Sequence, residues 1–301
     1  MTFDYLARLD ALRRLMEAEA VEGLLASIGA DLPYLTGYEA MPLERLTMLV
    51  VRQDSRAVLV VPELEAPRVA PRPEVFELRP WGETEDPVAI VAGLLGRPGS
   101  VIVGDQTWAT FLLELQQSLP DTQFAASSPL TRELRMRKDS EEIDALRRAA
   151  HATDRVATRL REIRFSGRTE ADLSRLVTDL VVEEGHQAAS FSIVASGPNG
   201  ASPHHEAGER IIGRGDAVVV DFGGTLDGYC SDTTRTFHVG EPTAEYRRIF
   251  TVLEGAQAAA VDAVRPGVAA QDIDRTAREV IERAGYEPHF IHRTGHGIGL
   301  E

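Results

Sequence analysis

The segment Ala217–Thr236 constrains the fold more than any other part of the chain, because it joins the pattern of a buried strand to two carboxylates. Its first four residues, Ala217–Val220, form an apolar run dominated by valine, which is typical of a buried β-strand. The run ends at Asp221, and a second run, rich in β-forming residues, contains Asp232. Between them lie residues that permit the positive φ values of a tight reversal, namely Gly223, Gly224 and Asp227-Gly228. We therefore predict a β-hairpin with one aspartate on each arm.

Two acidic side chains on facing strands need a physical explanation. A buried carboxylate costs free energy unless it is paired, hydrogen-bonded or coordinated, and two facing carboxylates repel, so that one takes up a proton. A divalent cation removes this repulsion, because hard cations prefer carboxylate oxygen. Considered alone, Asp221 is more often a turn cap and Asp232 more often a solvated surface residue. Their occurrence together on one apolar hairpin favours a metal site over those two interpretations.

Histidines at two other places add to this pattern. His296 lies between two glycines in the segment Thr294–Leu300, where the backbone can come close to a ligand, and neutral imidazole is a common ligand of first-row metals. His292 precedes it in the same region, and His204 follows a turn-rich loop, residues 196–203, shortly before the hairpin. Each histidine alone is more often structural. Together with the two aspartates they favour metal-assisted chemistry.

From about Arg135 onward the chain resembles the catalytic domain of metallopeptidase family M24, the group of prolidase, aminopeptidase P and methionine aminopeptidase. The motifs that carry the resemblance are, in chain order, Ile193–His204, Val220–Gly223 with Ser231–Thr236, and Thr294–Leu300. The resemblance implies an α+β pita-bread (creatinase/aminopeptidase-like) fold for residues 131–301, with its C-terminal part missing. Residues 1–130 resemble the α/β N-terminal domain of the prolidase and creatinase group. This extra domain points to the Xaa-Pro branch rather than to methionine aminopeptidase.

The resemblance also implies a role for individual residues. Asp221 matches a ligand that binds one metal ion through both oxygens, Asp232 matches a ligand that bridges two ions, and His296 matches a ligand of the other ion. His204 and His292 match histidines that line the substrate pocket, where they steady the scissile peptide or the tetrahedral intermediate.

The implied cofactor is a pair of divalent metal ions. Manganese or cobalt is usual in this group, although Asp, His and Glu ligands do not choose among Mn, Co, Fe and Zn. Thr234 matches a position beside these ions. The family set also contains two glutamates after the glycine-flanked histidine, and Glu301 falls at neither position. We therefore expect this chain to hold metal weakly or not at all, and to be impaired in catalysis.

The implied reaction is metal-dependent hydrolysis of the peptide bond before proline, in a dipeptide or a short peptide. Dipeptidase and aminopeptidase activity both stay open, because that choice depends on how the N-terminal domain, often from a partner subunit, narrows the cleft. The resemblance also implies a homodimer. Two alternatives remain, namely a catalytically inactive truncated homologue with a structural or binding role, and a creatinase-like amidinohydrolase, which needs no metal. The two aspartates and His296 argue against the amidinohydrolase.

Composition excludes several other classes of protein. The net charge of −15 argues against nucleic acid and against anionic membrane surfaces, because both need clustered Lys and Arg. No apolar run approaches the roughly 20 residues of a membrane span, and the N-terminus lacks a basic, then apolar, signal segment. The single cysteine, Cys230, excludes an intrachain disulfide and fits a reducing compartment. These features together predict a cytoplasmic protein without nucleic-acid or membrane partners.

Hydrophobic periodicity and capping residues predict the secondary structure around these motifs. The first 130 residues alternate strands and helices, which indicates an α/β layered domain, and no Gly-rich phosphate loop follows any of those strands. The patterns predict an irregular stretch over 62–81, a linker over 129–140, helices over 141–163, 169–185 and 272–284 and from Thr243 onward, and strands over 190–195 and 289–292.

Overall fold

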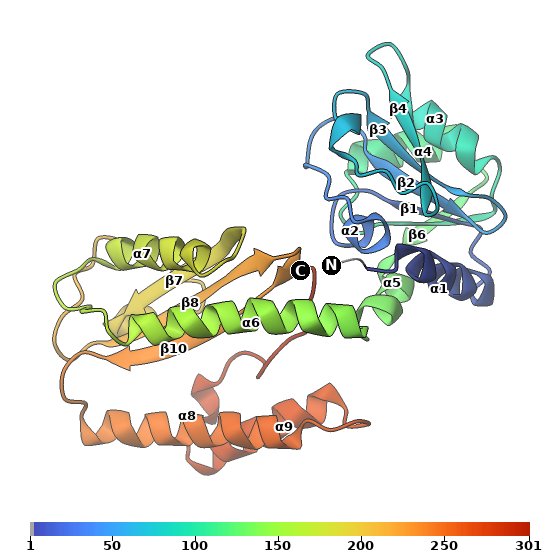
Figure 1. Cartoon of the computed structure of the whole chain (residues 1–301). Coiled ribbons are helices and arrows are strands. Elements are labelled where there is room, and N and C mark those ends of the chain that lie inside the picture. The colour runs from blue at the N-terminus through green and yellow to red at the C-terminus, as the bar shows by residue number, and fades with distance from the viewer. Residues whose placement is uncertain (1–2) are drawn as a thin grey trace. The chain divides into compact units, whose positions relative to one another are not determined.

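The structure is a computed structural model that describes residues 3–301, and it divides into two compact units (Figure 1). One unit comprises the chain up to Asp144 together with Leu300–Glu301, and the other comprises Ala145–Gly299. Each unit has its own sheet and its own hydrophobic cores.

A six-stranded mixed sheet forms the centre of the first unit, in the order β4-β3-β2-β1-β5-β6. The pairs β1–β5, β5–β6 and β3–β4 are parallel, and the pairs β1–β2 and β2–β3 are antiparallel. Inner strands of this sheet are continuous apolar runs, because both of their faces are covered. The strands are β1 (Gly23–Ala26), β2 (Met48–Arg52), β3 (Ala57–Pro62), β4 (Phe76–Trp81), β5 (Ser100–Val103) and β6 (Gln123–Ala126).

Helices cover both faces of this sheet. Leu9 of α1 and Leu32 of α2 pack in one core, and Val91 of α3 and Leu115 of α4 pack in the other. All four side chains are fully buried, and each such burial stabilises the fold by about 1.5–3 kcal/mol. The layered α/β arrangement predicted for this part of the chain is confirmed. The helices are α1 (Tyr5–Ala18), α2 (Asp31–Thr36), η1 (Ala66–Arg68), α3 (Pro87–Leu95), α4 (Ala109–Ser118) and α5 (Ser128–Arg135).

Two predictions for the first unit are wrong. The stretch 62–81 is not irregular throughout, because Phe76–Trp81 forms β4 and pairs with β3. Pro80 is tolerated there since β4 lies at the edge of the sheet, where a missing N–H breaks no second ladder. The predicted linker also begins as helix α5. Its Arg135 donates a hydrogen bond to Asp31 at 2.9 Å, so this arginine anchors the helix rather than belonging to a solvated linker.

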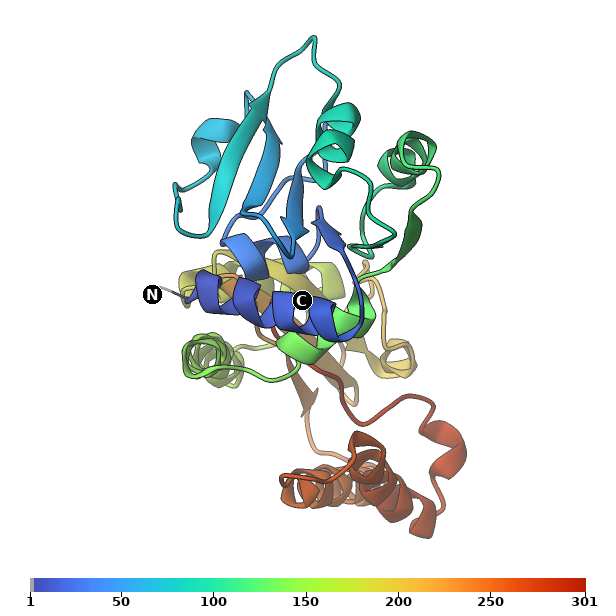
Figure 2. The same cartoon turned by 90° about the vertical axis from the view of Figure 1, so that its right-hand side faces the viewer.

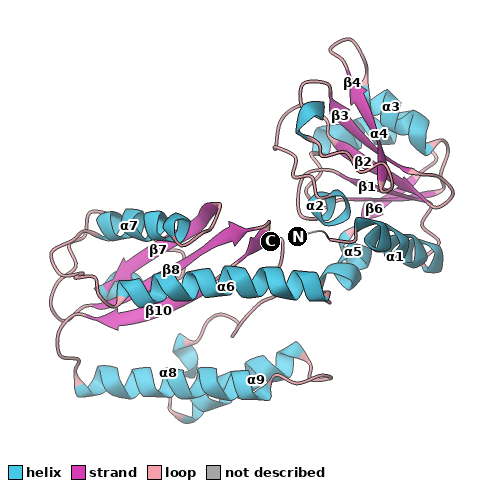
Figure 3. Ribbon diagram, viewed as in Figure 1, coloured by secondary structure: helices cyan, strands magenta, loops and turns pink. Residues whose placement is uncertain are grey.

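The second unit is built on an antiparallel sheet in the order β10-β8-β7, with the short β9 also paired to β8 (Figure 3). Val156 of α6 and Val177 of α7 pack with Val220 of β8 in its main core. Helices α8 and α9 lie side by side in both views of the molecule and share a small core of their own (Figures 1 and 2). The elements are α6 (Ser140–Leu160), α7 (Glu170–Glu183), β7 (Ala188–Ser196), η2 (Gly197–Ala201), β8 (Ala217–Leu226), β9 (Tyr229–Cys230), β10 (Thr233–His238), α8 (Ala244–Ala263), α9 (Ala270–Arg283) and η3 (Glu287–His289).

Capping residues explain where the helices of this unit begin and end. Thr169 accepts a hydrogen bond from Asp172 N at 3.0 Å, and Thr243 accepts one from Tyr246 N at 3.1 Å, so both act as N-caps. Gly185, with a φ of 112°, follows the end of α7. The helices predicted from these signals are confirmed. Within residues 3–301, none of the helices has both the length and the apolarity needed to cross a membrane.

The predicted hairpin is confirmed, but two of its glycines have a different role. The reversal occurs at Asp227 and Gly228, whose φ values are 53° and 80°, between the paired residues Leu226 and Tyr229. Gly223 and Gly224 instead lie inside β8.

Close backbone approach explains these two glycines. A Cβ atom on Gly223 would lie 2.0 Å from Ser231 O, and one on Gly224 would lie 2.5 Å from Ala188 O. The prediction that they supply positive φ values is therefore wrong, because both are required by the space between neighbouring strands.

The prediction of a strand over 289–292 is also wrong. The chain forms the short helix η3 up to His289 and has no regular structure after it. Arg278 of α9 donates to the carbonyl oxygens of Phe290 and His292 at 3.0 and 2.9 Å. These carbonyls therefore bond to a side chain of a helix instead of to a neighbouring strand.

Candidate metal centre

Strand β8 places its aspartate on the face of the sheet that α6 and α7 do not cover. Val218, Val220 and Phe222 are fully buried in the core that these helices form with the sheet. Side chains alternate along a strand, so Asp221 points to the opposite face. This alternation explains how a carboxylate interrupts an apolar strand without entering the core.

The register between β8 and β10 brings three of the predicted residues together. Thr234 lies directly opposite Asp221, and its hydroxyl donates to Asp221 Oδ1 at 2.7 Å. Asp232 directly precedes β10, and its charge acts on the Asp221 carboxyl, so the two aspartates lie near each other. The side chain of Asp232 is 33% exposed, so this side of the hairpin is open to solvent.

A buried histidine supports the chain just before Asp232. His186 Nδ1 lies 3.1 Å from Val181 O, and its Nε2 lies 2.8 Å from Ser231 Oγ. Because a carbonyl only accepts, Nδ1 carries the proton and Nε2 accepts from the serine hydroxyl. Burial lowers the pKa of His186, which favours this neutral form. No spacing or flanking motif in the sequence marks His186.

His296 meets Asp232 in a contact that needs a positive charge. Its Nδ1 lies 2.7 Å from Gly297 O, and its Nε2 lies 3.1 Å from Asp232 Oδ2. The carbonyl requires the proton on Nδ1, so in the neutral ring the lone pair of Nε2 faces a carboxylate oxygen. Two acceptors at this distance are stable only with a proton or a cation between them. The imidazole is 64% exposed, so an ion can reach it.

Electrostatics link Asp221 to the other predicted residues. Burial raises the pKa of the Asp221 carboxyl above its usual value, and the hydrogen bond from Thr234 opposes this effect. The negative charge of Asp232 raises the pKa further, whereas His204 and His296 lower it. The mutual repulsion expected for the two aspartates is thus present. His204 also acts on this carboxyl from the neighbouring loop.

The donor set suits a divalent cation, although it is not a closed site. Within residues 3–301, no three His, Cys, Asp or Glu side chains are disposed to hold one metal ion together. The hairpin and the histidine segment instead provide two carboxylates and one imidazole, of which Asp232 and His296 are in direct contact. Carboxylate oxygen and imidazole nitrogen are ligands for Mn, Co, Fe and Zn. The residues present fit part of a metal centre.

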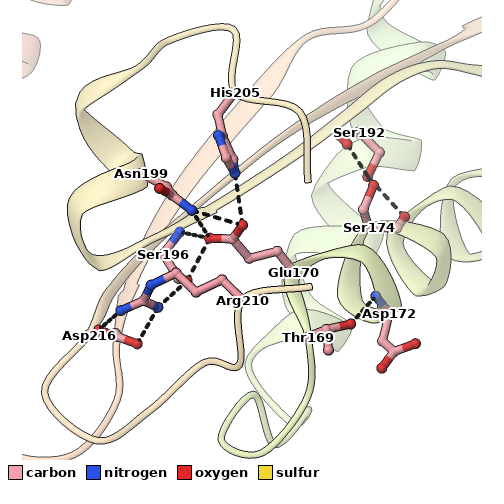
Figure 4. Close-up of polar contacts among 10 residues, drawn as sticks. All are labelled: Thr169, Glu170, Asp172, Ser174, Ser192, Ser196, Asn199, His205, Arg210 and Asp216. Atoms are coloured by element: carbon pink, nitrogen blue, oxygen red, sulfur yellow. Dashed lines mark hydrogen bonds and ion pairs between the residues drawn. The ribbon is translucent and has the colours of Figure 1, made fainter. Parts of the chain in front are cut away.

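A buried carboxylate anchors the loop that carries His204 (Figure 4). Glu170, the first residue of α7, is 0% exposed. Its oxygens accept from Ser196 N at 2.7 Å, from Ser196 Oγ at 2.6 Å, from Asn199 Nδ2 at 3.0 and 3.1 Å and from His205 Nε2 at 2.8 Å. The start of the helix is a favourable place for a negative charge. The motifs in the sequence mark neither Glu170 nor His205 as a site residue.

The same network reaches the beginning of β8 (Figure 4). Arg210 donates to Ser196 Oγ at 2.6 Å and to both oxygens of Asp216, at 2.8 and 2.9 Å. Asp216 directly precedes β8, the strand that carries Asp221. The hydrogen bond from Arg210 lowers the pKa of Asp216, so this pair is ionic.

A second polar cluster holds the segment that contains His292 and His296. Asp274 of α9 accepts from Arg278 at 3.1 and 3.3 Å, from Thr294 N at 2.8 Å and from Thr294 Oγ1 at 2.9 Å. The bonds from Arg278 and Thr294 lower the pKa of Asp274 to about 2. The His292 ring packs edge-on against the ring of Phe290, with 5.0 Å between the ring centroids. His292 therefore interacts with its own segment.

Two family models match the chain. Metallopeptidase family M24 matches residues 144–301, and the creatinase/prolidase N-terminal domain matches residues 8–137. Among curated proteins, the probable dipeptidase PepE of Mycobacterium tuberculosis is 43% identical over 300 residues, which cover 98% of this chain and 80% of that protein.

Solved structures agree with the family matches. The dipeptidase PepE of Mycobacterium ulcerans has a TM-score of 0.92 and 41% identity, and the match covers 100% of this chain and 83% of that one. The prolidase of Thermococcus sibiricus has a TM-score of 0.93 and 34% identity, with the same coverage of 100% and 83%. The predicted fold class, an α/β N-terminal domain followed by a pita-bread domain, is confirmed.

Proposed function

The chain belongs to metallopeptidase family M24, as its motifs predicted, and is a hydrolase; from this premise we propose that it cleaves the peptide bond before proline in dipeptides with the help of divalent metal ions. The contact of His296 Nε2 with Asp232 Oδ2, 3.1 Å apart beside Asp221, carries the proposal. Relatives named dipeptidase and prolidase, at 43% and 34% identity, favour dipeptides over longer peptides.

Each predicted ligand has a distinct role in the proposed reaction. Asp221 and Asp232 would hold a metal ion through oxygen, and His296 would hold it through Nε2, which carries no proton when Nδ1 donates to Gly297 O. Thr234 holds the Asp221 carboxylate in one orientation. When bound, manganese or cobalt ions supply Lewis acidity at the scissile carbonyl and make a water molecule acidic enough to attack at neutral pH.

Two histidines complete the proposed substrate pocket. His204 and His292 are both exposed. His204 can donate a hydrogen bond from an imidazole N–H, whereas the Nδ1 of His292 lies 2.8 Å from Arg293 O, so only its Nε2 faces the pocket. Directed at the peptide oxygen as its negative charge develops, one such donor lowers the barrier by about 3 kcal/mol. His204 acts electrostatically on Asp221, which supports its place near the reacting bond.

Hydrolysis of alanyl-proline in the presence of Mn²⁺ or Co²⁺ tests this function. We expect cleavage of alanyl-proline in preference to alanyl-alanine, and at least a hundredfold loss in Asp221→Asn. Asp227→Asn is the matched control, because Asp227 lies at the turn of the same hairpin and asparagine tolerates its positive φ of 53°. Equal rates on both dipeptides, or full activity of Asp221→Asn, would falsify the proposal. Turnover of creatine without added metal would instead identify the amidinohydrolase alternative.

Metal content is the second test. The ligands Asp221, Asp232 and His296 form an open site, because within residues 3–301 no three His, Cys, Asp or Glu side chains are disposed to hold one ion. We therefore expect the protein to retain well under two Mn²⁺ per chain after desalting. Elemental analysis of the desalted protein measures this directly. Two tightly held ions would mean that other carboxylates complete the site; no retained metal together with no turnover would favour the inactive-homologue alternative.

Three further expectations remain predictions. A homodimer is implied by the resemblance, and light scattering after size-exclusion chromatography measures it. A cytoplasmic location rests on the single cysteine, Cys230. A domain boundary at residues 130/131 was predicted from the sequence alone.

A further inference from the structure

Glu170 is more strongly hydrogen-bonded than the start of a helix requires. Thr169 already caps α7 by accepting from Asp172 N. A carboxylate removed from water costs several kcal/mol unless donors replace the lost solvent, and here four donor groups do so. An uncharged polar residue or an alanine at this position would avoid that cost. The buried charge therefore requires an explanation beyond the formation of α7.

All of these donors belong to one short segment. Ser196 ends β7, Asn199 lies in η2, and His205 lies just beyond it. Each donates to Glu170, so the beginning, middle and end of residues 196–205 converge on one carboxylate (Figure 4). A carboxylate only accepts, so His205 Nε2 carries a proton and the ring has a fixed tautomer.

His204 depends on this arrangement for its position. It directly precedes His205, so the bond between His205 and Glu170 fixes the backbone from which the exposed side chain of His204 extends. The charge of His204 acts on the Asp221 carboxyl. A loop free to shift by 1 Å would displace a substrate-facing group enough to reduce the rate by about a hundredfold.

We propose that Glu170 is a positioning residue for His204: it holds Ser196, Asn199 and His205, and so fixes the backbone from which the His204 side chain extends. The role of His204 toward substrate rests on the proposed function. The fixing of this backbone by Glu170 does not, because it follows from contacts within this chain.

The imidazole NMR signals of His204 test the positioning directly, on the full chain without added metal. They are assigned by their loss in His204→Gln. Glu170→Gln keeps the shape of the side chain but presents an amide NH₂ to a site of donors, so we expect the His204 signals to shift and broaden. His205→Leu removes the donor, and we expect it to produce the same change. The His205 side chain is 20% exposed, so this replacement leaves the core intact. The double variant should add nothing to the larger single effect, because both act through one contact.

Val177→Ala is the matched control, because Val177 is fully buried in the core on the same helix. It weakens α7 without removing a donor or an acceptor from the loop. Unchanged His204 signals in both Glu170→Gln and His205→Leu, or equal changes in Val177→Ala, would overturn the proposal.

Kinetics separate this proposal from the proposed function. With alanyl-proline, we expect Glu170→Gln and His205→Leu to lower kcat about tenfold or more while KM changes less. If the wild-type chain cleaves no prolyl dipeptide, the proposed function fails and the NMR comparison alone decides the positioning role. If the wild type is active and both variants keep its kcat, the positioning role fails.

Discussion

The buried carboxyl of Glu170 makes the stability of its unit depend on pH. Burial alone would raise its pKa, but hydrogen bonds from Ser196, His205 and Asn199 lower it from 4.5 to about 2. A carboxyl whose pKa is lower in the folded state stabilises the protein above its unfolded pKa and loses that effect as the pH falls toward the folded pKa. We expect a contribution of about 3 kcal/mol at neutral pH, of which roughly half is lost at pH 3.

Urea unfolding of the wild type and of Glu170→Gln between pH 7 and pH 3 measures this contribution. The difference in unfolding free energy should narrow as the pH falls through 4.5 toward 2, because the wild-type carboxyl becomes protonated. Asp216 and Asp274 also have lowered pKa values, but they titrate in both proteins and cancel in the difference. A difference that stays constant over this range would contradict the assignment.

The sequence predicts some residues of the candidate site but not the buried carboxylate that supports it. The motifs identified Asp221, Asp232 and His296 as candidates, and the register between β8 and β10 places Asp221 beside Thr234. Glu170 follows a capping threonine, which favours an acid at a helix start. Nothing local in the sequence reveals that this acid is buried, because its donors lie 26 to 35 positions further along the chain.

Among the secondary-structure elements, α9 holds the irregular segment that carries His292 and His296. Asp274 and Arg278 bind this segment from one side of the helix, through Thr294 and through backbone carbonyls. Such a segment has no ladder of its own, so a few side-chain contacts decide whether it is ordered.

Removing one of these contacts should loosen the segment and leave the helix intact. We expect Asp274→Asn to raise amide hydrogen exchange over residues 290–299 at least tenfold, because asparagine cannot replace a carboxylate that accepts from both Arg278 and Thr294. Glu279→Gln is the control, since Glu279 forms only an exposed pair with Arg283 on the same helix. Equal exchange in the two variants would show that α9 does not order the segment.

The elements themselves were predictable where the signal was local. Thr169 and Thr243 mark helix starts through their own hydroxyl groups, and both predictions are confirmed. The predictions of a strand over 289–292 and of an irregular stretch over 62–81 were wrong, because non-local contacts decide the structure of both segments. Arg278 binds the carbonyls of the first segment, and β3 pairs with part of the second. Both partners are distant in the sequence, so a local pattern cannot identify them.

At the scale of the whole molecule, each compact unit contains its own cores, and all the predicted ligands lie in the second unit. The chain has two tryptophans, Trp81 and Trp108, and both lie in the first unit. Tryptophan fluorescence therefore follows the unfolding of the first unit alone, whereas far-ultraviolet circular dichroism follows both. These two probes can locate a bound metal ion within the chain.

Mn²⁺ should stabilise the second unit selectively, because an ion that binds only the folded state adds about 1.4 kcal/mol when its free concentration is ten times the dissociation constant. We expect Mn²⁺ to move part of the circular dichroism transition to higher urea and to leave the fluorescence transition in place. Asp221→Asn should abolish the shift, and Asp227→Asn should keep it. An equal shift of the fluorescence transition would contradict this expectation, since the ion would then act on the first unit or the two units would unfold as one. A selective shift would place the metal on the β8–β10 face independently of any measured activity.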